Sequence, residues 1–243
     1  MREQILSYAL KYQGEWNQIT SALARQEPWE AVPYPKNYIT IADSQYPDSL
    51  RRLRYAPWIL FYEGNIDLLQ RKAVAIIGTR KCNAYGAAMG RHVCRLLKPH
   101  AIIVSGLAKG VDAIAHQEAL DCHTVGVIGC GLNVCYPKEN ANLYQVMRKQ
   151  QLIISEYPED VKPLAHHFPW RNRLIAALSS AVIVIQAQMR SGTMLTVNEA
   201  LEINVPVYCI PHLFQDPYGS GCNLLIAQGA NILVDEQDIL AIL

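Results

Sequence analysis

The sequence lacks several features that would place it in common protein classes. No apolar run is long enough to span a membrane, and the first residues carry Arg2 and Glu3 without the apolar stretch of a secretion signal, which favours a cytoplasmic protein. The seven cysteines include no CxxC pair, which favours reduced thiols over a disulfide framework or a zinc site. The formal net charge is only +1, so any site for a polyanion must be a local cluster of cations.

Motifs of common nucleotide-binding and catalytic sites are missing too. Gly129-Cys130-Gly131 has no third glycine in the register of a dinucleotide fingerprint, Gly106–Gly110 lacks the Gly-Lys-Ser/Thr of a P-loop, and no Gly-x-Ser-x-Gly elbow occurs. His116, His166 and His167 have no spacing typical of zinc ligands. We therefore expect no cofactor, no bound metal and no enzymatic activity.

The composition is that of a folded α/β protein. Hydrophobic residues make up 51% and charged residues 18% of 243 residues, enough for one full domain with a large core and a small addition. The apolar runs 74–77 and 102–104 are short and rich in β-branched residues, and each leads through a glycine-containing turn into a segment with helical character. Such units are typical of buried parallel strands joined by helices.

This alternation of strand and helix segments continues to the end of the chain. It predicts an α/β fold with a Rossmann-like, doubly wound and mainly parallel sheet. Further strands are expected at 124–128, 152–154, 181–186, 205–210 and 231–234, and helices at 84–97, 112–120, 139–150, 174–178, 194–203, 224–226 and 236–243. Asp112 is expected to cap the second of these helices at its N-terminus.

The chain divides into three parts by composition. Residues 1–36 contain two short amphipathic segments separated by Gly14 and end in a proline-rich stretch, which predicts a small N-terminal helical appendage. Residues 37–72 form a bridging extension with two strand candidates. Residues 73–243 carry the repeating α/β pattern and form the main domain.

Ligands of doubly wound sheets bind outside the carboxyl ends of the strands. The loops that follow the strands should therefore converge on one edge, where glycines let backbone N–H groups approach an anion. These loops are 78–81, 105–110, 129–138, 155–173 and 188–193, and their cations are Arg80, Lys81, Lys109, Lys138, Arg171, Arg173 and Arg190. The sequence thus predicts a basic edge with pockets for phosphate groups.

The stretch 167–173 places aromatic rings beside guanidinium groups. This combination suits the stacked bases and phosphates of single-stranded nucleic acid. The alternative is that Phe168 and Trp170 fill the core beneath a long loop while Arg171 and Arg173 pair with carboxylates of the preceding segment. The residues alone leave both interpretations open.

A set of motifs, taken in order, resembles the DNA-processing protein A (DprA/Smf) family over residues 37 to 235. The motifs are Val74–Arg80, Ser105–Asp112, Ala115-His116, Gly129–Asn133, Tyr136-Pro137, Glu139-Asn140, Ser155–Pro158, Phe168–Ala176 and Ser191–Thr196. The resemblance implies a protein that binds single-stranded DNA during natural transformation, protects incoming strands, loads the RecA recombinase onto them and works as a homodimer. The Rossmann-like domain of the family is not known for catalysis.

The resemblance also implies roles for individual residues. Arg80 would bind a phosphate, Lys109 would line the same pocket, and Phe168 would stack on a base. The complete set of implied DNA- and phosphate-binding residues is Gly78, Thr79, Arg80, Ser105, Gly106, Lys109, Gly110, Gly129, Gly131, Phe168, Arg171, Asn172, Arg173, Ser191, Gly192 and Thr193. Four positions depart from the usual family residues: Thr79 stands for serine, Asn133 for aspartate, Gln186 for glutamate and His212 for glycine. We interpret them as changes in pocket-lining or structural residues that remove no cation, so DNA binding is still expected.

A dimer interface is expected near the C-terminal end. Leu224, Leu225 and Ile226 are consecutive on a short helix, so at least one of them must face away from the sheet. Ile232 lies on a last strand that could be a sheet edge. The resemblance implies a contact at Ile226 and Ile232, and we add Leu225 of the same helix to the expected interface. The alternative is that all of these residues are buried within one protomer, beneath the final helix 236–243.

Two other classes of function remain open from the sequence. Thr196-Val197-Asn198-Glu199 matches part of a motif of nucleoside-monophosphate phosphoribohydrolases, although the preceding Gly-Gly-x-Gly is missing. An interaction protein without DNA binding is the third alternative.

Overall fold

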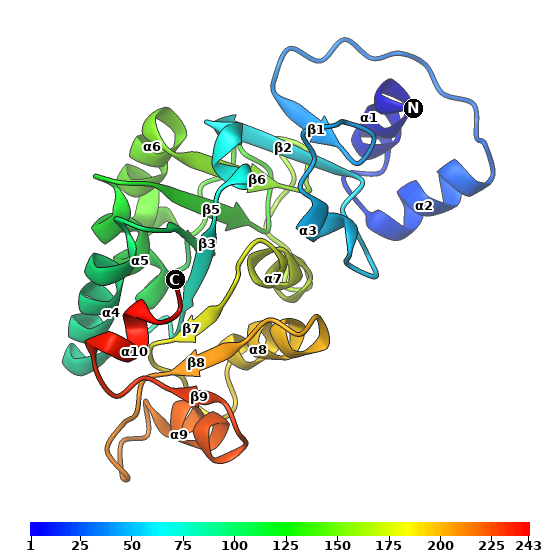
Figure 1. Ribbon diagram of the computed structural model, residues 1–243. Helices are drawn as coiled ribbons and strands as arrows, with labels where there is room; N and C mark the ends of the chain where they lie inside the picture. Colours follow the sequence, from blue (N-terminus) through cyan, green and yellow to red (C-terminus); the bar gives the residue numbers. More distant parts are fainter.

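Helices cover both faces of a nine-stranded sheet in the computed structural model, which describes all 243 residues (Figure 1). The strands are β1 (Tyr38–Thr40), β2 (Ile59–Gly64), β3 (Ala73–Ile77), β4 (Ile102–Ser105), β5 (Thr124–Ile128), β6 (Leu152–Ser155), β7 (Val182–Val184), β8 (Val207–Cys209) and β9 (Asn231–Ile232). The helices are α1 (Arg2–Lys11), α2 (Trp16–Ala24), α3 (Asp48–Arg51), α4 (Ala84–Leu97), α5 (Val111–Ala119), α6 (Ala141–Gln150), α7 (His167–Ala177), α8 (Gly192–Glu202), α9 (Ser220–Ala227) and α10 (Glu236–Leu240), with short 3₁₀ turns η1 (Ile66–Gln70) and η2 (Lys138–Asn140). None of the helices combines the length and the apolar character needed to cross a membrane.

The strand order is β1-β2-β6-β5-β4-β3-β7-β8-β9. Strands β3 to β9 pair in parallel, which confirms the predicted doubly wound, mainly parallel sheet. Strands β1 and β2 belong to the bridging extension 37–72 and join the same sheet, where β2 pairs antiparallel with β6 and β1 pairs antiparallel with β2. The extension therefore lengthens one edge of the main sheet.

The two faces of β3 carry different layers of helices, as its alternating side chains require. Val74 and Ile76 share an apolar cluster with α4, α5 and α10. Ala75 and Ile77 share another with α7, α8 and α9. Figure 1 shows α4 and α5 on one side of the sheet and α7 and α8 on the other.

The N-terminal helical appendage packs on the edge formed by β2 and α6. Ile5 of α1 and Ile19 of α2 lie in one apolar cluster with Phe61 of β2 and Tyr144 of α6. The predicted pair of short helices is present, and it shares a core with the main domain because neither helix could bury enough apolar surface alone. A long stretch without regular structure joins α2 to β1 (Figure 1).

Two predicted helix boundaries are wrong. Helix α7 begins at His167, seven residues before the expected Leu174, because Pro169 falls in its first turn, where a missing N–H costs nothing. Helix α5 is capped by Gly110 with φ +73°, and Asp112 lies inside the helix. A left-handed backbone at Gly110 favours glycine at this turn.

The position of the functional cleft follows from the strand order. From β3 the chain moves in one direction through β4, β5 and β6, and then returns through α7 to place β7 on the other side of β3. The loops after β3 and β7 therefore diverge to opposite faces of the sheet. Such a reversal opens a crevice at the carboxyl ends of the two strands.

Candidate nucleic-acid interface

A cleft of about 970 Å³ lies at this reversal point. The loop after β3, the start of α7 and the start of α8 form its walls. Among the residues predicted from sequence, it is lined by Gly78, Thr79, Arg80, Phe168, Arg171, Asn172, Ser191, Gly192 and Thr193. A side pocket of about 50 Å³ adds Gly106 and Lys109, and it shares Arg80, Phe168 and Arg171 with the cleft.

The rim of the cleft carries a cation above an aromatic ring. The Arg80 guanidinium lies 5.6 Å from the centroid of the Phe168 ring, and Arg80 is exposed and has no ion-pair partner within 4.0 Å. The Tyr136 ring packs beside Phe168 at 5.3 Å between centroids. A free guanidinium over one aromatic ring, with a second ring beside the first, can bind a phosphate while a base stacks nearby.

Arg171 forms the floor of the cleft. It is buried, and its Nη1 donates to the Val127 carbonyl oxygen, whereas its Nε has no hydrogen-bond partner. Burial lowers the pKa of Arg171, and the nearby Asp112 carboxylate acts in the opposite direction. Burial raises the pKa of Asp112, and the charge of Arg171 opposes this shift. The two buried groups therefore balance each other and leave one guanidinium donor unused.

The loop after β4 is shaped to admit Arg171. A Cβ atom on Gly106 would lie only 2.2 Å from the Arg171 Nη1 atom, so only glycine leaves room for the guanidinium. The next residue, Leu107, has φ +54°, a strained value for leucine. Asn140 Nδ2 donates to the Leu107 carbonyl at 2.9 Å and to the Ala108 carbonyl at 3.1 Å, which holds this conformation.

The first turn of α8 closes the opposite wall. Ser191 is the N-cap residue, but its side chain makes no capping bond and its buried Oγ has no partner. Gly192 and Thr193 follow in the first turn and line the cleft. Backbone N–H groups at a helix N-terminus lack intrahelical partners and favour an anion.

Lys109 stands at the edge of the side pocket and is already paired. Its ammonium group contacts the Glu139 carboxylate, and both side chains are exposed. The hydrogen bond from Lys109 lowers the pKa of Glu139. This cation is therefore partly neutralised, unlike Arg80.

Arg173 corrects one expectation from the sequence. Its guanidinium makes a bidentate pair with Glu156, with both N–O distances 2.6 Å, and only 4% of its side chain is exposed. Its Nε donates to the Tyr55 carbonyl oxygen at 3.0 Å. The alternative interpretation, pairing with a nearby carboxylate, is correct for this arginine, and Arg173 braces the bridging extension against α7.

Four other predicted residues lie outside the cleft. The Ser105 hydroxyl is buried and donates to the Ile76 carbonyl oxygen at 2.6 Å. The backbone of Gly129 packs against that of His167, and Gly131 packs against the chain at 158–159. These residues and the capping Gly110 shape the loops without lining the cleft. A glycine at a strand end can serve close packing or a ligand, and the sequence does not separate the two uses.

The lining residues that the sequence analysis did not assign to the site include Tyr136 and Asp112. Tyr136 follows the glycine-rich turn after β5, where an exposed aromatic ring is itself a signal of stacking. Asp112 was interpreted as a helix cap, and its actual role beside Arg171 depends on the fold.

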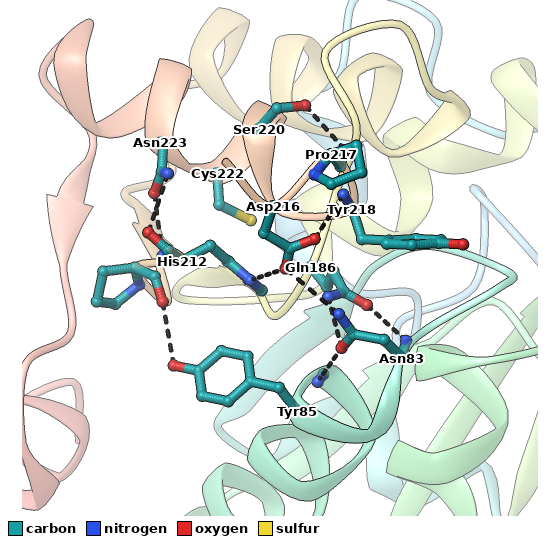
Figure 2. Close-up of polar contacts among 12 residues, drawn as sticks. Asn83, Tyr85, Gln186, His212, Asp216, Pro217, Tyr218, Ser220, Cys222 and Asn223 are labelled. Carbon is teal, nitrogen blue, oxygen red and sulfur yellow. Dashed lines mark hydrogen bonds and ion pairs between the residues drawn. The ribbon is translucent and has the colours of Figure 1, made fainter. Parts of the chain in front are cut away.

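Two of the four departures from the usual family residues meet in one network behind the Arg80 loop (Figure 2). The backbone N–H of Asn83 donates to Gln186 Oε1 at 3.0 Å, and Gln186 Nε2 donates back to Asn83 Oδ1 at 2.9 Å. Asn83 Nδ2 also donates to Asp216 at 3.3 Å, and Asp216 contacts the His212 ring at 3.3 Å. A glutamate at position 186 could not donate to Asn83, so the glutamine suits this network.

His212 lies between two hydrogen-bond acceptors in this network. Its Nε2 faces the Ile185 carbonyl oxygen at 2.9 Å and its Nδ1 faces the Asp216 carboxylate, an arrangement that favours the protonated ring because both partners accept hydrogen bonds. Burial lowers the pKa of His212, but the adjacent Cys222 thiol, the Ile185 carbonyl and Asp216 together raise it above its ordinary value. The network fixes the loop 211–219 to the N-terminus of α4, where Asn83 is the cap.

The predicted dimer residues fall into two groups. Leu225 is buried in the core of its own protomer, so its assignment to an interface is corrected. Ile226 is half-buried at the border of that core, and Ile232 on the edge strand β9 is exposed together with Val234. The remaining surface, which we call the α9–β9 face, consists of Ile226, Ile232 and Val234.

Comparison with known proteins supports the resemblance found in the sequence. The model of the DNA recombination-mediator protein A family matches residues 37–243. The DNA processing protein DprA of Streptococcus pneumoniae is 44% identical over 204 residues, which are 83% of this chain and 72% of that protein.

Two solved structures are similar in fold and sequence. The crystal structure of DNA processing protein A from S. pneumoniae has a TM-score of 0.83 at 36% identity and covers 99% of this chain and 93% of its own. DNA processing protein A from Helicobacter pylori, described for its single-stranded DNA binding mode, has a TM-score of 0.78 at 34% identity and covers 85% of this chain and 95% of its own. The ordered motifs, the Rossmann-like sheet and these matches agree, and this chain belongs to the DNA recombination-mediator protein A (DprA/Smf) family.

Proposed function

We propose that this protein binds single-stranded DNA in the cleft at the carboxyl ends of β3 and β7. The observation that carries the proposal is the Arg80 guanidinium, which is exposed, unpaired and placed over the Phe168 ring. Two further donors in the same cleft, Arg171 Nε and Ser191 Oγ, are buried without partners. Buried donors are costly to leave unpaired, and the oxygens of a nucleic-acid backbone would satisfy them.

Each part of the cleft has a distinct task in this proposal. Arg80 and the first turn of α8 bind phosphate groups, and Phe168 with Tyr136 offers a stacking surface to a base. In a duplex the bases stack on each other and cannot reach such a surface. The protein should therefore prefer single strands and show little preference among bases, since every base has a π-face.

Membership of the DNA recombination-mediator protein A family supports a role for this activity in DNA uptake and recombination. The H. pylori relative described for its single-stranded DNA binding mode supports strand binding by the shared fold. We extend the proposal to the protection of incoming single strands in the cytoplasm and their delivery to the RecA recombinase. In this proposal the protein acts by binding and not by catalysis.

A titration with two probes tests the proposal. Fluorescence anisotropy with labelled oligo-dT and with a duplex of equal length, across a salt series, should give tighter binding of the single strand at every salt concentration. Equal affinity for both forms would contradict the proposal. No binding of either would favour an interaction protein without DNA binding.

The phosphoribohydrolase alternative has less support from the geometry. Thr196 lines the cleft, but Glu199 does not. Burial, and then the charge of Glu202, raises the pKa of Glu199, which shows a partly shielded carboxyl group on α8. Release of free base from AMP that is lost in Glu199→Gln would revive this alternative.

We also propose that two copies associate through the α9–β9 face. The edge strand β9 exposes Ile232, Val234 follows it and is also exposed, and Ile226 of α9 is half-buried. A two-fold contact would cover these apolar side chains with the same surface of a second copy. Ile226→Glu should give a folded monomer with weaker binding to long strands, because two linked sites raise the effective concentration. Sedimentation and circular dichroism measure both effects, and a monomeric wild type at micromolar concentration would refute the dimer.

A further inference from the structure

Three potential metal ligands from distant parts of the sequence meet where the N-terminal helices reach the main domain. Glu15 is the N-cap residue of α2, and His166 and His167 lie at the start of α7. The Glu15 Oε1 atom is 3.6 Å from His166 Nε2 and 3.5 Å from His167 Nε2. All three ligand atoms lie within 4.8 Å of one another.

His167 is held in the form that a metal requires. Its Nδ1 is 3.2 Å from the Gly129 carbonyl oxygen, which can only accept, so Nδ1 carries the proton. Its Nε2 is buried, has no hydrogen-bond partner and points toward the cluster, while only 1% of the side chain is exposed. Metal-bound histidines commonly donate their other N–H to a backbone carbonyl in this manner. The Tyr157 ring stacks on the imidazole at 3.9 Å and fixes its plane.

The spacing between the Glu15 oxygen and each of the two histidine nitrogens fits a small tetrahedral ion. Ligand bonds of about 2.0–2.1 Å in a tetrahedron place neighbouring ligand atoms roughly 3.3–3.4 Å apart. The two oxygen–nitrogen distances are close to this value. A set of two imidazole nitrogens and one carboxylate oxygen binds Zn²⁺ in preference to Mg²⁺ or Ca²⁺, which favour oxygen ligands.

Access to the cluster is open on one side. The side chains of His166 and Glu15 are 65% and 41% exposed, whereas His167 forms the buried base. An ion can enter from solvent and keep water at its fourth position. A simple ion pair between Glu15 and a protonated histidine is the competing explanation, and it would leave the buried His167 Nε2 without a hydrogen bond.

We propose that Glu15, His166 and His167 form a zinc site that fastens the N-terminal helical appendage to the DNA-binding domain. The site joins the start of α2 to the start of α7, and the residue after His167 is Phe168, the aromatic ring at the rim of the cleft. Zinc would thus hold in place the turn of α7 that presents Phe168. Sequence spacing could not reveal this site, because Glu15 is far from the two histidines along the chain.

Cobalt, a coloured substitute for zinc, tests the site directly. Titration of the tag-free protein with Co²⁺ should produce the visible absorption bands of a four-coordinate site and saturate at one equivalent, and Zn²⁺ should abolish the bands. Isothermal titration with Zn²⁺ should show affinity falling by at least about tenfold in Glu15→Gln and in His166→Ala. Both changes are at accessible positions, so the variants should fold, which circular dichroism checks.

The chain offers a matched control. His92 and Glu236 form another surface histidine–carboxylate pair at 3.0 Å, with no third ligand. His92→Ala should leave zinc affinity unchanged. Zinc should also raise the melting temperature of the wild type and of His92→Ala but not of the two site variants, because an ion that binds only the folded state stabilises it.

Two results would overturn the proposal. Zinc affinity that is equal in Glu15→Gln, His166→Ala and His92→Ala would assign the binding to scattered surface histidines. Absence of saturable Co²⁺ and Zn²⁺ binding to the wild type would leave an ion pair only. Neither result depends on DNA binding, so the site and the proposed function are tested separately.

Discussion

Arginines at the rim of the cleft and arginines at its floor differ in burial and in pairing. At the rim, Arg80 is exposed and unpaired above Phe168. On the floor and behind it, Arg171 and Arg173 are buried: Arg171 donates to a backbone carbonyl near the Asp112 charge, and Arg173 is held by a bidentate carboxylate. A buried charge must be balanced for the chain to fold, whereas an exposed one can be left free for a ligand. The number of arginines is therefore a poor guide to binding, and their environment decides their role.

This difference separates changes that unfold the protein from changes that only weaken DNA binding. The largest effect is expected behind the floor. Arg173→Ala leaves the Glu156 carboxylate buried without its partner, and the free energy of unfolding should fall by about 3–5 kcal/mol. Urea denaturation followed by circular dichroism measures this change.

A double variant sharpens this prediction. In Arg173→Met with Glu156→Leu both charges are removed, and most of the lost stability should return because no buried charge remains unpaired. If Arg173→Ala were as stable as the wild type but bound DNA poorly, Arg173 would belong to the binding site. The claim that buried, paired arginines stabilise the fold while exposed ones bind DNA would then be wrong.

A smaller effect, on binding alone, is expected from the aromatic ring at the rim. Phe168→Ala should cost about 1–3 kcal/mol of single-strand affinity through lost stacking, and the dependence of affinity on salt should stay the same. Phe214 is the matched control, since it is 97% exposed on a loop outside the cleft. Phe214→Ala should bind the strand as the wild type does, and equal losses in both variants would contradict a specific stacking role.

The smallest effect concerns the paired cation of the side pocket. Glu139→Gln releases Lys109 from its carboxylate, so single-strand affinity should rise by about two- to fivefold at low salt. The gain should vanish at high salt, where exposed charges are screened. Anisotropy at two salt concentrations measures it, and a loss of affinity would mean that the pair itself shapes the pocket.

The fold could be predicted from the sequence to a large extent because it rests on local patterns. The apolar run 74–77 and the helix 84–97 appear where periodicity predicts them. The start of α7 was missed because Pro169 and the neighbouring polar residues resemble a loop until the first helical turn is recognised.

The site could be predicted only in outline. The rule that ligands bind beyond the carboxyl ends of parallel strands placed Arg80, Phe168 and Ser191 in one cleft correctly. Whether Arg171 and Arg173 are free to bind a ligand depends on the direction in which each side chain points from α7. It also depends on their partners in β5 and in the loop after β6. Such contacts join residues far apart in sequence, and no local pattern encodes them.

Arg80→Ala provides the most direct test of the account. Single-strand affinity should fall by about 1–3 kcal/mol, and the slope of log affinity against log salt should flatten by roughly 0.7, the value for one phosphate contact on a single strand. The free energy of unfolding should stay unchanged, because Arg80 is exposed and unpaired. Arg91→Ala, which removes an exposed arginine of α4 outside the cleft, should alter neither affinity nor slope. An unchanged slope in Arg80→Ala would mean that no phosphate binds at the rim, and the assignment of this cleft to single-stranded DNA would be wrong.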